Sequence, residues 1–319
     1  MKILLTGGCG FIGSHIADAL VQDPQVQELL VLDNLSTGSL SNLQHLLQHP
    51  KLRFVEADIR DAEACIQLAA GAYAICHQAA LGSVPRSIAD PQGTHAVNLN
   101  GFLNVLNAAR IQGVQRVVYA SSSSVYGHLQ TPVKTEDQLG KPLSPYAVTK
   151  QANEAYAEAF ARCYDLMITG FRYFNVFGPR QNPEGPYAAV IPLFVTAALQ
   201  KRPATIYGDG TITRDFTYVS NVVKANLHAL LHTSVTTGRH EVYNIACGQT
   251  TNLLRIWEMI GKEAGYRSAP VFAAPRKGDI PFSLASVAKA AAALNYTHLV
   301  GVEEGIRQTV DWYRTALNT

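Results

Sequence analysis

The sequence predicts an α/β fold in which a doubly wound parallel sheet is joined to a smaller, mixed α/β lobe. Short apolar runs alternate with helical segments through the first half of the chain, which is typical of a parallel sheet covered by helices. From about Asn175 this alternation weakens, and proline, glycine and tyrosine become more frequent. The length of 319 residues suits one large α/β unit with a second lobe. We expect residues 1–175 to form the first domain, which also receives about 211–247, and residues 176–319 to form the interleaved lobe.

The first predicted element is a strand, Lys2–Thr6, which runs into a glycine-rich turn and then a helix through about Leu20. This order is typical of a dinucleotide-binding (Rossmann) opening. Gly7 would permit the tight turn, Gly10 would let the backbone approach a pyrophosphate, and Gly13 would let helix and strand pack closely. The alternative is an ordinary flexible turn, and the strands that follow argue against it.

The second predicted strand, Glu28–Asp33, ends on a carboxylate where an acceptor for both adenosine ribose hydroxyls is expected. A carboxylate at Asp33 would repel a 2′-phosphate, so the sequence favours NAD over NADP. The third strand, 52–58, ends on Asp58, which could bind the adenine amine. A simple turn aspartate before Arg60 is an equally good interpretation of Asp58.

The next predicted elements are a strand at 73–80, a helix at 90–112, a strand at 117–120 and a helix over Pro145–Tyr164. In the last helix Tyr146 and Lys150 lie four residues apart, so they share one face. A lysine ammonium beside a phenol is expected to lower the pKa of Tyr146 toward the range of a general base. This spacing alone is usually an exposed pair without function. Ser122, at the end of the preceding strand, and the dinucleotide turn favour a proton-transfer site instead.

Composition excludes several other classes of protein. A net charge of +2 with interspersed signs gives no basic stripe, so neither nucleic-acid nor membrane-surface binding is predicted. The five cysteines are scattered and odd in number, which predicts free thiols and neither a metal site nor a disulfide framework. No apolar run approaches the roughly 18 residues of a membrane span. We expect a cytoplasmic protein.

With these features, the chain resembles the extended short-chain dehydrogenase/reductase superfamily, and within it the nucleotide-sugar epimerases, over nearly its whole length. The motifs that carry the resemblance are the glycine turn from Gly7 to Gly13, Asp33-Asn34, Asp58, His77-Gln-Ala-Ala80, the Ser122 region, Tyr146-x-x-x-Lys150, the segment 172–178, Tyr207-Gly-Asp-Gly, and Arg214-Asp-Phe-x-Tyr-Val219. The segments 81–87 and 276–283 are most similar to the UDP-N-acetylglucosamine 4-epimerase branch of the UDP-glucose 4-epimerase family.

The resemblance implies an NAD-dependent enzyme that inverts C4 of a UDP-hexose through a 4-keto intermediate. In that reaction Tyr146 takes the proton of the 4′-hydroxyl, Lys150 binds the nicotinamide ribose, and Ser122 steadies the developing oxyanion. Ser123 is the alternative to Ser122, because it is the immediate neighbour with the same chemistry. The resemblance also implies a homodimer in which the helices at 90–112 and 145–164 pair with their symmetry mates as a four-helix bundle.

The resemblance implies two sets of binding residues. The cofactor-binding set is Gly7, Gly10, Phe11, Ile12, Gly13, Asp33, Asn34, Ser36, Thr37, Gly38, Asp58, Ile59, Gln78, Ala79, Ala80, Tyr146, Lys150 and Tyr173. The substrate-binding set is Ser83, Arg86, Ser122, Tyr146, Asn175, Ala189, Val190, Tyr207, Arg214, Arg276, Asp279 and Ser283.

Within the substrate set, Asn175 and the helix start at Ala189 would bind phosphate, since free helix amides suit an anion. Arg214 and Arg276 would supply cations for the pyrophosphate, while Tyr207 and Asp279 would face uracil and its ribose. Each has an alternative interpretation: Arg214 could pair with the neighbouring aspartate, and Tyr207 could be a core aromatic.

Ser283 stands where resembling epimerases that reject N-acetyl sugars carry a bulky tyrosine, so we expect acceptance of UDP-GlcNAc and UDP-GalNAc as well as UDP-glucose and UDP-galactose. The alternative is that Ser283 only ends a loop and that Phe282 or Leu284 forms the wall. Related 4,6-dehydratases carry an Asp-Glu pair where this chain has Ser123 and Ser124, and serine cannot replace that acid and base. Two other functions remain open: a UDP-glucuronate 4-epimerase, and an NAD- and nucleotide-sugar-binding protein without turnover.

Overall fold

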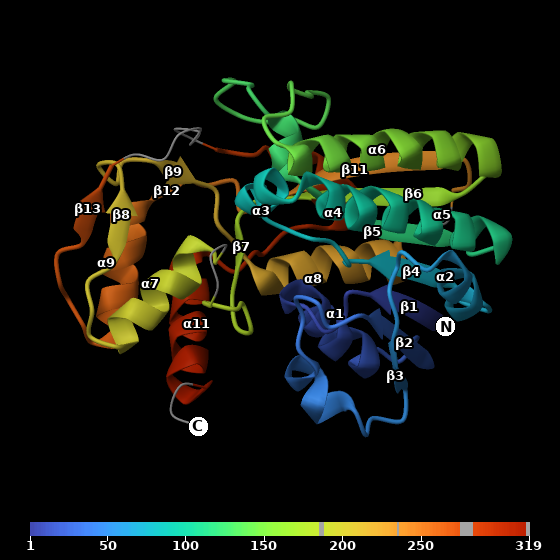
Figure 1. The fold of residues 1–319 in the computed structure, drawn as a ribbon, viewed down its shortest axis with the longest axis horizontal. Helices are drawn as coiled ribbons and strands as arrows, with labels where there is room; N and C mark the ends of the chain where they lie inside the picture. Colours follow the sequence, from blue (N-terminus) through green and yellow to red (C-terminus); the bar gives the residue numbers. More distant parts are fainter. Residues whose placement is uncertain (185–187, 235, 275–282, 317–319) are drawn as a thin grey trace.

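A parallel sheet of seven strands forms the middle layer of the larger part of the molecule (Figure 1). The computed structural model describes residues 1–184, 188–234, 236–274 and 283–316. The strands of the sheet are β1 (Lys2–Thr6), β2 (Glu28–Asp33), β3 (Leu52–Glu56), β4 (Ala74–His77), β5 (Arg116–Ser122), β6 (Met167–Tyr173) and β11 (Arg239–Ile245). Their order is β11-β6-β5-β4-β1-β2-β3. The order reverses between β1 and β4, which is where a doubly wound sheet opens a crevice at its carboxyl edge.

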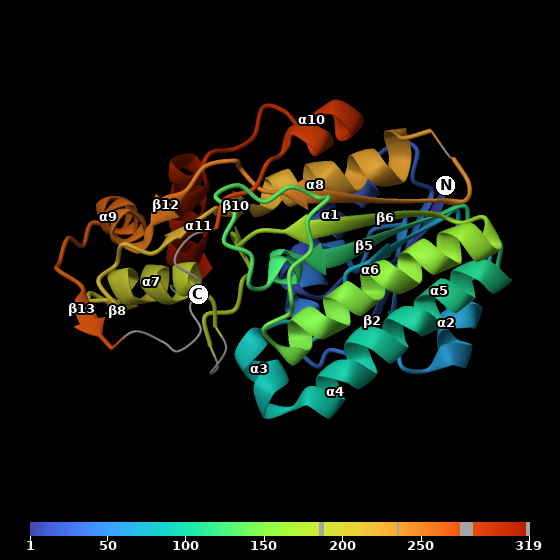
Figure 2. The same ribbon diagram turned by 90° about the horizontal axis from the view of Figure 1, so that it is seen from above.

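Helices cover both faces of this sheet. They are α1 (Phe11–Gln22), α2 (Ala62–Ala69), α5 (Gly101–Ile111), α6 (Pro145–Tyr164), α8 (Val219–Leu227) and α10 (Ala288–Leu294). One face packs against α2, α5 and α6 through buried residues such as Phe102 and Ala157. The other packs against α1, α8 and α10 through residues such as Ile16 and Leu294 (Figure 2). The predicted doubly wound α/β fold is therefore confirmed.

A second lobe lies beyond the carboxyl edge of the sheet and has its own core (Figure 1). Its helices are α7 (Val190–Leu199), α9 (Leu253–Ala264) and α11 (Val302–Ala316). Its short strands are β7 (Val176–Phe177), β8 (Thr205–Tyr207), β9 (Thr213–Arg214), β10 (Thr217–Tyr218), β12 (Thr251–Asn252) and β13 (Val271–Ala273). Phe194, Trp257 and Tyr313 fill the core between these elements. The chain leaves the lobe to form α8 and β11 and then returns; the exact domain boundaries stay a prediction.

The strand predicted at 52–58 ends at Glu56, and the one predicted at 117–120 covers Arg116–Ser122; two other predicted elements differ more. The strand expected at 73–80 is only Ala74–His77, because the residues after it leave the sheet. The helix expected at 90–112 is divided into α4 (Pro91–His95), a π-helical turn (Ala96–Asn100) and α5, and the short α3 (Val84–Ala89) precedes it. Within the π turn Asn98 is buried and bonds both backbone groups of Leu81. No helix in the described ranges is long and apolar enough to cross a membrane.

Candidate active site

The turn between β1 and α1 is so tight that two of its positions admit only glycine. Gly7 has a φ of +72°, and a Cβ there would lie 2.5 Å from the amide nitrogen of Ala79. A Cβ on Gly13 would lie 2.1 Å from the carbonyl oxygen of Gly7. The first turn of α1 is therefore held directly over the end of β1, with its amides at the carboxyl edge of the sheet.

A cavity of about 380 Å³ opens at this edge, and most of the predicted cofactor residues line it. Those in its wall are Gly7, Gly10, Phe11, Ile12, Gly13, Asp33, Asn34, Ser36, Thr37, Ile59, Gln78, Ala79, Ala80, Tyr146, Lys150 and Tyr173. Two predicted residues are not in the wall. Gly38 packs against the backbone of Cys9, where a Cβ would approach within 2.7 Å. The other is Asp58.

The two predicted adenosine carboxylates have different surroundings. Asp33 is buried against the glycine turn, where its oxygens accept the backbone N–H groups of Cys9 and Leu35, both at 2.9 Å. Asp58 instead accepts hydrogen bonds from Arg60 and Asn34, each at 2.7 Å. These bonds, the one from Arg60 above all, lower the pKa of Asp58 to about 2. Asp58 thus has the contacts of the turn aspartate considered as its alternative.

The first cavity fits a dinucleotide. A Cβ on Gly10 would meet only the carbonyl oxygen of Gly7, at 3.2 Å, so the wall leaves open space where a pyrophosphate would approach the backbone. The start of α1 borders this space, and the buried Asp33 carboxylate stands at the end of the neighbouring strand. A helix N-terminus and a fixed acceptor are the groups that a pyrophosphate and an adenosine ribose need.

Tyr146, Lys150 and Ser122 meet in the wall of the same cavity. The side chain of Ser122 lies close enough to the Tyr146 phenol to act on its pKa. The buried Lys150 ammonium donates to the carbonyl oxygen of Ala120 at 2.7 Å and lies 5.8 Å from the centre of the Tyr146 ring. The predicted lowering of the Tyr146 pKa by this ammonium is corrected here: burial raises that pKa, and the neighbouring side chain of Ser122 opposes the rise. Burial lowers the pKa of Lys150 to about 8.

The serines after Ser122 are placed differently from it. The Oγ of Ser122 accepts the backbone N–H of Ser124 at 3.1 Å, which begins the turn Ser123–Tyr126. Ser123 is not part of the cavity wall, whereas Ser122 is. The Oγ of Ser124 is buried and has no hydrogen-bond partner among the described residues. The geometry therefore favours Ser122 over Ser123 as the hydroxyl beside Tyr146.

A second cavity, of about 600 Å³, lies under α7 in the lobe and shares Asn175 with the first. Val190, Tyr207 and Arg214 line it, as predicted for a nucleotide site. Tyr207 is 37% exposed, which excludes the core-aromatic alternative. Ala189 precedes α7 without capping it by a side-chain bond, and the neighbouring residues on both sides of Ala189 are in the wall.

Asn175 itself has a φ of +36°, and its side-chain amide donates to the backbone oxygen of Asp215 at 2.9 Å. The carboxylate of Asp215 accepts the backbone N–H groups of Cys247, Gly248 and Ala285. Burial raises the pKa of Asp215 to about 6. These contacts hold the segments that surround the junction of the two cavities.

Three of the remaining predicted substrate residues, Ser83, Arg86 and Ser283, are not in the walls of either cavity. Ser83 caps α3 by accepting the N–H of Arg86. Ser283 is half-buried and precedes the segment that Asp215 holds. Arg276 and Asp279 lie outside the described residues.

Sequence reasoning missed several wall residues. In the first cavity they are Leu32, Ala57, Leu81, Gly82, Val97, Ala120, Ser121 and Val176; in the second they include Leu193, Phe194, Arg202 and Leu253. Most are small or apolar and carry no motif. For Ser121, its position in the Ser-rich segment was the available signal.

Comparisons with known proteins agree with this geometry. The model of the NAD dependent epimerase/dehydratase family matches residues 3–246. The chain is 37% identical, over 316 residues, to a UDP-glucose 4-epimerase of Mycolicibacterium smegmatis, covering 98% of this chain and 99% of that protein. It is similar to the structure of a Thermotoga maritima UDP-glucose 4-epimerase with UDP-glucose, with a TM-score of 0.92, 36% identity and coverage of 99% and 100%. It is also similar to a UDP-N-acetylglucosamine 4-epimerase from Methanobrevibacter ruminantium in complex with UDP-N-acetylmuramic acid, with a TM-score of 0.92, 35% identity and coverage of 99% and 98%.

Proposed function

The chain belongs to the NAD dependent epimerase/dehydratase family, and from this premise we propose that it inverts C4 of a UDP-hexose through a 4-keto intermediate. The predicted family, the class of NAD-dependent UDP-sugar 4-epimerase and the cofactor are confirmed at this level. The roles of individual residues and the choice of sugar are the finer parts of the proposal. The observation that carries it is that Ser122, Tyr146 and Lys150 lie together in the wall of the first cavity, which the glycine turn also lines.

The proposed mechanism assigns one task each to Ser122, Tyr146 and Lys150. A C4 stereocentre has no acidic C–H, so inversion needs oxidation to a flat ketone and reduction from the other face. When bound, NAD accepts the hydride from C4 and returns it. Tyr146 removes the proton of the 4′-hydroxyl and later gives it back, while Ser122 donates to the oxygen that gains charge. Lys150 binds the nicotinamide ribose and so holds the cofactor beside Tyr146.

The second cavity supports the placement of the nucleotide. We propose that Asn175 and the first turn of α7 bind the diphosphate, with Arg214 as its fixed cation. Tyr207 would contact uracil. Because Asn175 lies in the wall of both cavities, a sugar attached to that diphosphate would extend toward Tyr146.

For the sugar, we propose that UDP-GlcNAc and UDP-GalNAc are accepted together with UDP-glucose and UDP-galactose. The small Ser283 in place of a bulky tyrosine supports this choice. The test is incubation of the purified protein with a panel of UDP-hexoses, with product stereochemistry followed by NMR. Turnover of UDP-glucuronate alone would indicate the glucuronate epimerase instead. NAD in the denatured protein without turnover of any sugar would indicate a binding protein.

We also propose a homodimer through α5 and α6. These helices pack against each other and carry large apolar side chains that are exposed in the single chain: Ile111 at 48%, Val148 at 51% and Tyr156 at 41%. A second copy that pairs the same helices would cover them as a four-helix bundle. Sedimentation velocity should give twice the mass of one chain, and a monomer would contradict the pairing.

A further inference from the structure

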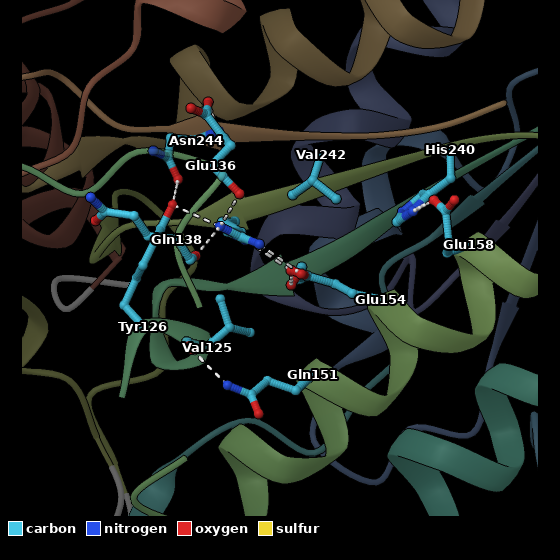
Figure 3. Close-up of polar contacts among 12 residues, drawn as sticks. Val125, Tyr126, Glu136, Gln138, Gln151, Glu154, Glu158, His240, Val242 and Asn244 are labelled. Atoms are coloured by element: carbon cyan, nitrogen blue, oxygen red, sulfur yellow. Dashed lines mark hydrogen bonds and ion pairs between the residues drawn. The ribbon is translucent and has the colours of Figure 1, made fainter. Parts of the chain in front are cut away.

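A buried ion pair joins β6 to α6, next to β5, the strand that ends at Ser122. This pair has no role in the mechanism described above. Arg172 of β6 binds Glu154 of α6 through two nitrogens, at 3.0 and 2.8 Å, and the side chains are only 2% and 8% exposed. Arg172 also donates to the hydroxyl of Tyr126 at 2.9 Å, and Tyr126 donates to Asn244 at 2.6 Å (Figure 3). Removing two charges from water is costly, so such a pair is weak evidence of stabilisation and calls for another role.

Glu154 also contacts β5. Its carboxylate accepts the hydroxyl of Ser121 at 2.6 Å. Ser121 is the residue before Ser122, and the residue before Ser121 accepts the hydrogen bond of the Lys150 ammonium. Lys150 and Glu154 are four residues apart in α6, on one face of the helix. Two successive turns of α6 therefore hold two successive residues of β5, directly before Ser122.

Glu154 also affects the protonation of Lys150 through its negative charge. Burial lowers the pKa of Lys150 to about 8, and the negative charge of Glu154 acts in the opposite direction. His77, which faces Lys150 from β4, has its pKa lowered to about 3 by burial first and by Lys150 second, so it is neutral and offers no compensating charge. Burial would lower the pKa of Arg172, but its bonds to Glu154 raise it, so Arg172 stays charged.

Two further titratable groups interact with Glu154 from the strands of the sheet, and neither carries a charge at neutral pH. Burial raises the pKa of Tyr119 on β5, and burial lowers the pKa of His240 on β11. His240 bonds Glu158, one further turn along α6 (Figure 3). Glu154 is thus the carboxylate that acts on Lys150, with Arg172 on its other side.

We propose that Glu154 is a positioning residue for the reaction: it holds Ser121, and with it the Ser122 end of β5, and it keeps a negative charge one helical turn from the Lys150 ammonium. The inference rests on the proposed function, because it gives Lys150 and Ser122 the tasks stated there. Arg172 fixes the carboxylate of Glu154 so that one oxygen remains directed at Ser121.

The test uses Glu154→Gln, which keeps the size of the side chain and removes its charge. The pKa of Lys150 is measured by NMR on protein labelled with ¹³C-lysine, assigned with Lys150→Arg. We expect a fall of about one unit, the usual effect of one nearby charge. The alkaline limb of the kcat–pH profile should move to lower pH by the same amount, because Lys150 loses its proton earlier. Glu158→Gln, which removes the same charge one turn further along α6 at a 43% exposed side chain, should change neither quantity.

An unchanged Lys150 pKa in Glu154→Gln would overturn the inference, even if the melting temperature falls. If that variant does not fold because Arg172 is left unpaired, Glu154→Gln/Arg172→Met removes both charges and is judged by the same NMR measurement. Glu154→Asp, which retains the charge, should keep the pKa of Lys150 near its original value while kcat falls. The NMR titration needs no turnover, so a protein inactive on every UDP-sugar would refute the proposed function and still decide this inference.

Discussion

The cavity at the edge of the sheet and the cavity under α7 share Asn175 but are built in different ways. The first is walled by the ends of parallel strands and by the turns that follow them, so backbone groups and small residues form much of its surface. The second is walled by α7, β8, the segment around Arg214 and one residue of α9, which belong to no common sheet. A parallel sheet brings the residues after each strand to one edge, whereas the lobe depends on contacts between segments far apart in the chain. We therefore expect changes in the first cavity to affect chemistry and cofactor, and changes in the second to affect substrate affinity.

The largest expected effect is that of Tyr146→Phe in the first cavity. The variant loses the hydroxyl that would take the proton but retains the ring in the cavity wall and its helix. We expect kcat to fall at least about a hundredfold, the usual scale of a general acid–base contribution, with the content of bound NAD unchanged. Tyr164→Phe, near the exposed end of the same helix, is the matched control and should keep full activity. Near-normal turnover of Tyr146→Phe would refute the assigned base.

The next effect is that of Arg214→Gln in the second cavity. Loss of a charge-assisted bond to the diphosphate costs about 1.5–3 kcal/mol, so KM for the UDP-sugar should rise roughly tenfold to a hundredfold. NAD content should stay constant, because Arg214 lines only the second cavity. Arg255→Gln removes an exposed arginine of α9 outside both cavities and serves as the control. A loss of bound NAD in Arg214→Gln would contradict the assignment of the cofactor to the first cavity and of the diphosphate of the substrate to the second.

A smaller effect is expected when the carboxylate of Asp33 is neutralised. In Asp33→Asn one oxygen can still accept a backbone N–H, but the charge that repels a 2′-phosphate is gone. The ratio of NAD to NADP affinity should fall by roughly tenfold, which corresponds to about 1.4 kcal/mol. Cofactor released from denatured protein and binding titrations measure this ratio. Asp58→Asn, which alters a residue outside the cavity wall, should leave it unchanged, and an equal change in both variants would argue against a special role for Asp33.

The two cavities also differ in how much of each could be predicted from the sequence. Gly7, Gly13 and Asp33 lie together in the wall of the first cavity because strand ends in a parallel sheet converge at one edge, whatever the loops between them do. The shared face of Tyr146 and Lys150 follows from helix periodicity alone. The direction of the Tyr146 pKa was predicted wrongly, because depth of burial is a tertiary property that spacing along a helix does not contain.

The missed role of Glu154 has a related cause. Its spacing from Lys150 was visible, but its partner Arg172 lies on another strand, and the Ser121 contact depends on how α6 packs over β5. The described part of the lobe contains only two-stranded sheets, so the positions of its residues cannot be deduced from the order of strands along the chain. The motif residues Tyr207 and Arg214 line the second cavity, whereas Ser83 and Ser283 line neither cavity.

The smallest and most selective effect is expected from Ser283→Tyr. The backbone next to Ser283 is fixed, because Leu284 accepts the N–H of Lys134 at 2.8 Å and Ala285 donates to Asp215 at 3.3 Å. A tyrosine would therefore add its ring toward the neighbouring space without moving the chain. If that space holds the C2 substituent of the sugar, overlap with an acetamide costs about 1–3 kcal/mol, so kcat/KM for UDP-GlcNAc and UDP-GalNAc should fall roughly tenfold more than for UDP-glucose and UDP-galactose. Ser283→Ala keeps the small volume and should leave both pairs unchanged. Equal losses for the two pairs, or no activity of the unmodified protein on UDP-GlcNAc, would place the wall of the sugar pocket at another residue, such as Phe282 or Leu284.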